Sequence, residues 1–181
     1  ENSISTLLVR SATQVRKDII DNCPSLKIIG RGGVGMDNID VEYAKSKNIN
    51  VINTPAASSK SVAELVFSHL FGCVRFLHES NRSMPLDGDS KFKELKKSYA
   101  GGRELAGKKI GIIGFGRIGQ EVAKIAIGIG MEVVFHDKFI DEASLEIEFF
   151  DGQNISFNMT SSSFDEVLEK SDFISVHIPA S

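Results

Sequence analysis

The stretch KIGIIGFGRIG, residues 109–119, decides the fold of this chain. Its first five residues are a lysine followed by four apolar residues, a pattern of the kind that makes a buried strand. Gly114, Gly116 and Gly119 then follow with the spacing GxGxxG at the start of a helical pattern. A strand, a tight glycine turn and a helix N-terminus together present unpaired N–H groups to an anion. Residues 109–119 therefore predict a parallel α/β domain that binds the pyrophosphate of a dinucleotide.

The glycines of this motif have separate tasks. Gly114 permits the tight turn, Gly116 lets the backbone approach a pyrophosphate, and Gly119 lets the helix pack closely on the strand. Arg117 and Ile118 open the helix, so we expect their N–H groups to face the same anion. One alternative stays open, namely a domain of this fold that has lost its nucleotide.

A carboxylate follows the next predicted strand. Asp137 stands 18 residues beyond Gly119, near the position from which a carboxylate meets the adenosine ribose. There it would accept hydrogen bonds from both ribose hydroxyls and repel a 2′-phosphate, which favours NAD over NADP. The adjacent Lys138 weakens this preference slightly. The alternative interpretation of Asp137 is a carboxylate that serves only the turn after the strand.

Strands and helices alternate on both sides of the motif. We expect strands at 4–10, 26–30, 49–53, 109–113, 131–135 and 172–176, and helices at 15–22, 41–47, 117–127 and 163–170. A capping box of Ser61 and Glu64 predicts the start of a long helix that ends by Arg82. A polar, lysine-rich connection over residues 84–102 and a β-hairpin over residues 145–159 complete the pattern. This alternation predicts α/β architecture with parallel sheets whose faces are covered.

Composition excludes several classes of protein. The 181 residues carry 21 Lys and Arg against 24 Asp and Glu, so a polybasic nucleic-acid or membrane-surface protein is not expected. Neither a spanning apolar stretch nor a signal peptide is visible. Cys23 and Cys73 lack metal-binding spacing, and we interpret them as reduced, buried thiols of a cytoplasmic protein without a metal site.

Several motifs together resemble a known family. They are LVRSAT at 8–13, IGRGGVGMDNID at 29–40, NTP at 53–55, VAE at 62–64, the glycine motif, and SVHIP at 175–179. In this order they are similar to the D-isomer-specific 2-hydroxyacid dehydrogenases, and within that family to the branch that oxidises 3-phosphoglycerate. The resemblance covers nearly the whole chain.

The resemblance implies a division of the chain. Residues 1–55 would be part of a flavodoxin-like substrate domain, 56–103 an interdomain helix with a dimerisation arm, and 104–181 the first half of a Rossmann-type, doubly wound NAD domain. The family's catalytic arginine, acidic residue and histidine would all lie after Ser181. The chain would then be truncated at both ends, contain no catalytic residue and show no turnover by itself. The backbone of His177, Ile178 and Pro179 would line the adenosine site.

The resemblance also implies a substrate site. In the family, N–H groups of the loop after the second substrate-domain strand bind the substrate carboxylate, which here falls on Gly33, Val34 and Gly35. Arg10 and Arg31 end two neighbouring predicted strands, and two guanidinium groups near a carboxylate site favour a phosphorylated 2-hydroxy acid. The alternative is that both arginines are ordinary surface residues at strand ends.

The function implied is the NAD-dependent oxidation of 3-phosphoglycerate to 3-phosphohydroxypyruvate, the first step of serine biosynthesis. A related dehydrogenase, such as a reductase of glyoxylate or hydroxypyruvate, is an alternative that needs no phosphate site. An NAD-sensing, corepressor-like binding protein is an alternative of another class. We expect a homodimer or higher homo-oligomer, because residues 62–77 carry more apolar side chains than one buried helix face requires.

Overall fold

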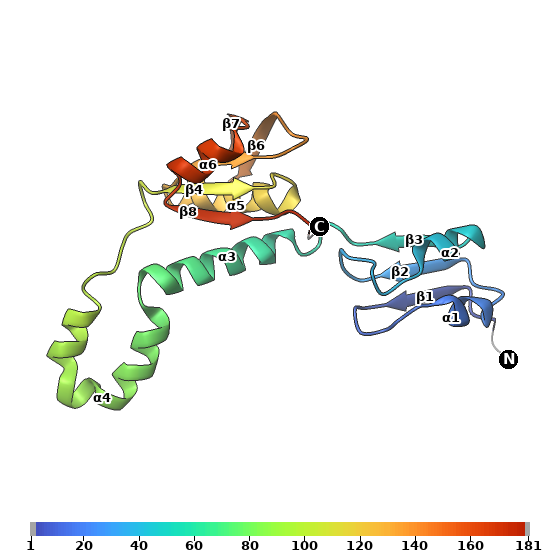
Figure 1. Ribbon diagram of the computed structural model, residues 1–181, viewed down its shortest axis with the longest axis horizontal. Helices are drawn as coiled ribbons and strands as arrows, with labels where there is room; N and C mark the ends of the chain where they lie inside the picture. Colours follow the sequence, from blue (N-terminus) through green and yellow to red (C-terminus); the bar gives the residue numbers. More distant parts are fainter. Residues whose placement is uncertain (1–2, 180–181) are drawn as a thin grey trace. The chain divides into compact units, whose positions relative to one another are not determined.

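The computed structural model describes residues 3–179, which divide into two compact α/β units, with the boundary in the sequence after Ser59 (Figure 1). The first unit contains β1 (Thr6–Val9), α1 (Lys17–Asp21), β2 (Ile28–Arg31), α2 (Val41–Ser46) and β3 (Asn50–Asn53). Its strands form a parallel sheet in the order β1-β2-β3, and Val9, Arg31 and Asn53 are in register. The carboxyl ends of all three strands therefore lie at one edge of the sheet.

Within the described residues, only one face of this first sheet is covered. Ile20 of α1 and Ala44 of α2 belong to the same buried cluster as Val9 and Ile29. Side chains alternate between the faces of a strand, and Leu8 in the neighbouring position is 76% exposed. The prediction that both faces are covered is wrong here, because both helices pack on the same face.

The second unit begins with two helices and continues as strands and helices in alternation. It contains α3 (Ser59–Val74), α4 (Leu77–Ser98), β4 (Lys109–Ile113), α5 (Arg117–Gly128), β5 (Glu132–His136), β6 (Glu142–Glu148), β7 (Asn154–Thr160), α6 (Phe164–Lys170) and β8 (Phe173–Val176). A parallel sheet has the order β5-β4-β8, and β6 and β7 form the predicted antiparallel hairpin. The predicted strands and helices around the glycine motif are confirmed within a few residues.

Helices cover both faces of the second sheet. Ile110 and Ile112 of β4 belong to a buried cluster that also contains Val122 of α5. Gly111 points to the opposite face, where a Cβ atom would lie 2.7 Å from Cγ1 of Val167 in α6. The prediction of covered faces is therefore correct for this sheet, which carries the glycine motif.

The segment around residues 84–102 differs from its prediction. Residues 77–98 are helical, although Pro85 lies inside the helix and Lys91 has non-helical dihedral angles, with φ −121°. Leu, Lys and Glu have good helix propensity, which explains why a polar segment with no buried residue still forms a helix. Phe76, in the left-handed conformation with φ 53°, separates α3 from α4.

Two further predictions are wrong. Helix α3 begins at Ser59, so Ser61 lies inside the helix and not at its N-cap, where the capping box placed it. Cys73 is exposed and Cys23 only half-buried, because α3 buries the face that carries Ala63 and Phe67 and leaves Cys73 outside it. No helix in residues 3–179 is long and apolar enough to cross a membrane.

Candidate functional site

The glycine loop joins β4 to α5 in the second unit. The N–H of Gly114 donates to the carbonyl of His136 at 2.8 Å, which fixes the loop to the end of β5. Gly119 is buried where a Cβ atom would overlap the carbonyl oxygen of Gly114. Only glycine therefore permits this approach of helix to strand, as the motif predicted.

The loop leaves open space where an anion would bind. Gly116 is the N-cap of α5, and a Cβ atom built on it meets no atom within 4 Å. Arg117 is exposed, whereas the side chain of Ile118 is half-buried against the apolar cluster. The N–H groups of the first helical turn have no carbonyl partners inside the helix, so this end of α5 can receive a phosphate group.

Asp137 lies beside the glycine loop and is held by main-chain donors. Its Oδ2 accepts from the N–H of Phe115 at 2.6 Å, and its Oδ1 accepts from those of Phe139 at 2.8 Å and Ile140 at 3.2 Å. Partial burial raises the pKa of Asp137, but these hydrogen bonds outweigh burial and hold the pKa below its usual value. The carboxyl is therefore ionised at neutral pH, and each oxygen can accept more than one hydrogen bond.

The end of the β6–β7 hairpin supports this carboxylate. The Oγ of Ser161 accepts from the N–H of Asp137 at 3.3 Å, and the N–H of Ser162 donates to the carbonyl of Phe135 at 2.8 Å. The Nδ1 of His136 lies 2.9 Å from the carbonyl oxygen of Ser162. These serines were not predicted as site residues, although they follow directly after the alternating pattern of the hairpin.

The end of β8 lies against the glycine loop. The N–H of His177 donates to the carbonyl of Ile113 at 2.7 Å, and its Nε2 lies 2.8 Å from Oγ of Ser175. Burial lowers the pKa of His177, so the ring is neutral at pH 7. A Cβ atom on Gly114 would lie 2.7 Å from Cγ2 of Ile178, whereas Pro179 beyond it is exposed. The structure thus brings residues 177 and 178 to the loop at residue 114.

The second predicted site lies in the first unit, in the loop after β2. Gly33 has φ +146°, and its N–H donates to Oγ1 of Thr54 at 2.8 Å. The carbonyl of Gly33 accepts from the N–H of Thr54, and the carbonyl of Val34 accepts from Nδ2 of Asn53. The main chain of the loop is thereby tied to the end of β3.

These hydrogen bonds reduce the number of N–H groups that are free to bind a substrate carboxylate. Of the three N–H groups predicted to meet a carboxylate, that of Gly33 is engaged by Thr54. The N–H groups of Val34 and Gly35 have no acceptor among residues 3–179. The sequence motif could not reveal this, because Thr54 stands 21 residues further along the chain.

Both predicted arginines line one pocket at the carboxyl ends of β1, β2 and β3. The pocket has a volume of about 520 Å³ and an apolar wall that includes Leu8 and Ile52. Arg10 is exposed at its rim, and the guanidinium of Arg31 lies across Gly33, where a Cβ atom would overlap Nη1. The Nε of Arg31 is buried and has no partner in the described part of the chain.

This arrangement can bind an anion but cannot move a proton. Guanidinium groups and free main-chain N–H groups are donors only, and they suit carboxylate or phosphate oxygens. Of the residues that line the pocket within the described chain, none is His, Asp or Glu. The pocket therefore offers groups that can bind an anion but no general acid or base.

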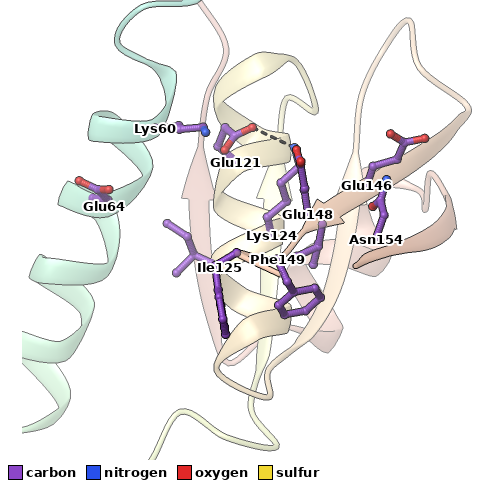
Figure 2. Close-up of a pocket in the computed structure, with 11 residues that line it drawn as sticks. Lys60, Glu64, Glu121, Lys124, Ile125, Glu146, Glu148, Phe149 and Asn154 are labelled. Carbon is purple, nitrogen blue, oxygen red and sulfur yellow. Dashed lines mark hydrogen bonds and ion pairs between the residues drawn. The ribbon is translucent and has the colours of Figure 1, made fainter. Parts of the chain in front are cut away.

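A larger hollow, of about 660 Å³, lies in the second unit, between α3, α5 and the β6–β7 hairpin (Figure 2). Its charged side chains have both signs, and Lys124 pairs with Glu121 at 3.1 Å. None of the predicted site residues lines it. Within residues 3–179, no three His, Cys, Asp or Glu side chains are grouped as a metal site requires.

A family model described as "D-isomer specific 2-hydroxyacid dehydrogenase, catalytic domain" matches residues 2–170. The chain belongs to this family. Membership in the D-isomer specific 2-hydroxyacid dehydrogenases agrees with the parallel sheets and with the two glycine loops at strand ends.

Relatives within the family carry different activities. A hydroxypyruvate reductase from Thermotoga maritima is 44% identical over 97% of this chain, which corresponds to 52% of that protein. A D-3-phosphoglycerate dehydrogenase from Methanocaldococcus jannaschii is 40% identical over 96% of this chain and 30% of its own length. The chain thus spans about half, or less, of the length of these relatives.

A solved structure adds a cofactor to the comparison. The D-lactate dehydrogenase from Aquifex aeolicus, complexed with NAD and lactic acid, matches 98% of this chain and 49% of that one. Its TM-score is 0.67 at 30% sequence identity. A structural relative of this chain therefore binds NAD.

Proposed function

We propose that this chain is part of an NAD-dependent dehydrogenase that oxidises 3-phosphoglycerate to 3-phosphohydroxypyruvate. One observation carries the proposal: Arg10 and Arg31 line the same pocket, next to a loop with free main-chain donors. Two guanidinium groups beside two N–H groups match a substrate with two anionic ends. Such a substrate is a phosphorylated 2-hydroxy acid.

In this proposal the first unit binds and orients the substrate. The N–H groups of Val34 and Gly35 would hold the carboxylate, since fixed main-chain donors lose no side-chain entropy on binding. The guanidinium of Arg10 would hold the phosphate, and that of Arg31 would lie between the two anionic groups. These contacts would hold the C2 hydroxyl in one orientation, which is the main contribution of positioning residues.

The second unit would hold the adenosine half of NAD. The open space at Gly116 fits a pyrophosphate, and the ionised Asp137 beside it fits the ribose hydroxyls. When bound, NAD would accept the hydride from C2 of the substrate. We place the histidine and the arginine that complete the reaction in the part of the enzyme after Ser181, so the isolated chain would not turn over.

The proposal assigns each segment a part of a larger enzyme. Residues 1–55 would belong to a flavodoxin-like substrate domain, 56–103 to an interdomain helix and arm, and 104–181 to the first half of a Rossmann-type NAD domain. The sheet order β5-β4-β8, with covered faces and a glycine loop after β4, supports the last assignment.

Apolar exposure on the first two helices of the second unit supports a homodimer. Leu65 and Phe71 on α3 are 55% and 43% exposed, and Leu86 on α4 is 85% exposed. Exposed apolar side chains that recur along neighbouring helices are typical of a surface that a second subunit covers. Light scattering of the full-length protein at micromolar concentration should return a dimer, and a monomer would contradict this part of the proposal.

A second candidate is the reduction of hydroxypyruvate, because the relative that is 44% identical has that activity. Hydroxypyruvate carries no phosphate, so it needs no second cation. Steady-state kinetics of the full-length enzyme with 3-phosphoglycerate and with D-glycerate would separate the two candidate functions. We expect a higher kcat/KM for 3-phosphoglycerate than for its unphosphorylated counterpart, D-glycerate, and the reverse order would favour the second candidate.

A further inference from the structure

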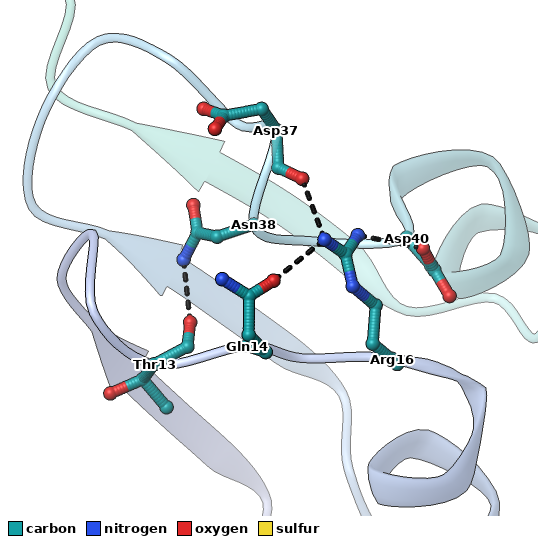
Figure 3. Close-up of polar contacts among 6 residues, drawn as sticks. All are labelled: Thr13, Gln14, Arg16, Asp37, Asn38 and Asp40. Atoms are coloured by element: carbon teal, nitrogen blue, oxygen red, sulfur yellow. Dashed lines mark hydrogen bonds and ion pairs between the residues drawn. The ribbon is translucent and has the colours of Figure 1, made fainter.

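Asn38 is a buried polar residue next to the proposed substrate site. Its side chain lies in the loop between β2 and α2, and the residue is 2% exposed. Its Nδ2 donates to the carbonyl of Thr13 at 2.7 Å (Figure 3). The same nitrogen donates to the carbonyl of Arg10 at 3.0 Å. A single buried amide thus holds two carbonyls of the loop that follows β1.

This loop has little other support. Residues 10–14 are all exposed, so packing does not fix their positions. The turn has one internal main-chain bond, from the N–H of Thr13 to the carbonyl of Arg10, and it is long at 3.3 Å. The two shorter bonds from Asn38 therefore supply the main buried anchor for the backbone at Arg10.

Asn38 is itself fixed before any ligand binds. The main-chain carbonyl of Asn38 accepts from the N–H of Val15 at 2.8 Å. The N–H of Asp40 donates to the main-chain carbonyl of Val15 at 3.0 Å. The guanidinium of Arg16 then bonds to Oδ1 of Asp40 and to the carbonyl of Asp37 (Figure 3). The segments on both sides of the amide are thereby clamped together.

The chemistry of the site requires an amide donor. Two carbonyl acceptors need two N–H donors on one short side chain, and the primary amide of asparagine provides them. The Oδ1 of Asn38 has no partner among the described residues, so the nitrogen is the atom that binds. An aspartate of the same size would direct acceptors at both carbonyls.

We propose that Asn38 is a positioning residue that fixes the backbone at Arg10 so that its guanidinium meets the anionic group of the substrate. The inference rests on the proposed function, because it acts through the role assigned to Arg10. A free loop would still carry the guanidinium, but binding would then have to order the loop. Loss of the anchor therefore raises KM and leaves kcat and NAD binding nearly unchanged.

A double-mutant cycle in the full-length enzyme tests this inference. The four proteins are the wild type, Asn38→Asp, Arg10→Ala and the double variant, each assayed for KM and kcat with 3-phosphoglycerate and for NAD affinity. We expect Asn38→Asp to raise KM roughly tenfold, which is the scale of losing one or two buried hydrogen bonds. In the Arg10→Ala background the same change should have little effect on KM.

Tyr43→Phe is the matched control for stability. It removes the hydroxyl that donates to Asp21 in the same unit without touching the loop, so KM should stay within about twofold. If Asn38→Asp does not fold, Asn38→Ser replaces it under the same criterion. Failure of both to fold would make Asn38 a determinant of folding and would overturn the inference.

The outcomes separate the inference from the function on which it rests. An equal rise in KM in both backgrounds, or a lower melting temperature with unchanged KM, would overturn the role of Asn38. If Arg10→Ala itself leaves KM for 3-phosphoglycerate unchanged, the proposed function fails instead. In that case, unchanged amide exchange at residues 11–13 in Asn38→Ser would also exclude the anchoring role.

Discussion

Each of the two parallel sheets of this chain has a glycine loop at a strand end, but the two loops present hydrogen-bond donors in different ways. In the second unit the loop runs directly into α5, so the helix N-terminus supplies donors and Gly116 supplies space. In the first unit nine residues separate β2 from α2, and the donors are loop N–H groups with the guanidinium groups of Arg10 and Arg31. One site depends on backbone geometry and the other on charged side chains.

This difference predicts which substitutions matter in each unit. Backbone changes should dominate in the second unit, where a Cβ atom would meet main-chain atoms. Changes of charge should dominate in the first unit, where side chains reach the pocket.

The largest effect is expected for Gly119→Ala. The new Cβ would overlap the carbonyl oxygen of Gly114, and backbone cannot move aside as a flexible side chain can. We expect a loss of about 2–3 kcal/mol in the free energy of unfolding and no measurable NAD binding. Gly128→Ala in the same helix is the control, because its Cβ meets no atom within 4 Å. Urea denaturation and fluorescence titration would show the contrast, and similar losses for both variants would contradict it.

A smaller effect is expected for Gly33→Ala in the first unit. Alanine at φ +146° is strained, and its Cβ would displace the guanidinium of Arg31. We expect a loss of about 1–2 kcal/mol in stability and a raised KM for the phosphorylated substrate. Gly32→Ala is the control for stability, since the closest atoms to its Cβ lie 3.8 Å away. A KM that stays unchanged in Gly33→Ala would separate this loop from substrate binding.

The smallest effect concerns Asp137 and pH. Because the pKa of Asp137 is lowered in the folded protein, its charged form stabilises the fold above the usual carboxyl pKa of about 3.9. This stabilisation is lost as the pH falls through the lowered pKa. Asp137→Asn should therefore cost about 1 kcal/mol at pH 7, and the difference from wild type should shrink below about pH 4. A difference that is the same at pH 7 and pH 3 would contradict this account.

The same variant tests cofactor choice. We expect wild-type enzyme to bind NAD more tightly than NADP by about 1–3 kcal/mol, since Asp137 favours ribose hydroxyls and repels a 2′-phosphate. Asp137→Asn should narrow that gap. Equal affinities of the wild type for both cofactors would remove the role given to Asp137.

The two sites also differ in how far the sequence could predict them. The glycine loop and Asp137 follow from spacing within 29 residues, because one strand, one turn and one helix bring them together. The hydrogen bond from Gly33 to Thr54 joins residues that are 21 positions apart in the sequence, and the bond from Asn38 to Arg10 joins residues that are 28 positions apart. Such contacts depend on which strands pair, and a local pattern does not contain that information.

Helix α4 shows a different limit of sequence reasoning. Pro85 and a run of lysines indicated a connection, yet helix propensity between these residues was sufficient for a helix that buries none of its side chains. Exposure of Cys73 follows from the same region, because α3 carries apolar residues around most of its surface and only one face meets the core. In both cases the missing information was which face the rest of the protein covers.

The proposed function depends on recognition of a phosphate by Arg10, which the substrate preference of Arg10→Ala in the full-length enzyme tests. The measurement is the ratio of kcat/KM for 3-phosphoglycerate to kcat/KM for D-glycerate, in the wild type and in the variant. We predict that the substitution lowers this ratio by at least about tenfold, because the loss of a charge-assisted hydrogen bond affects only the phosphorylated substrate. A proportional loss on both substrates, with an unchanged ratio, would contradict the claim and would assign Arg10 to the fold or to the carboxylate.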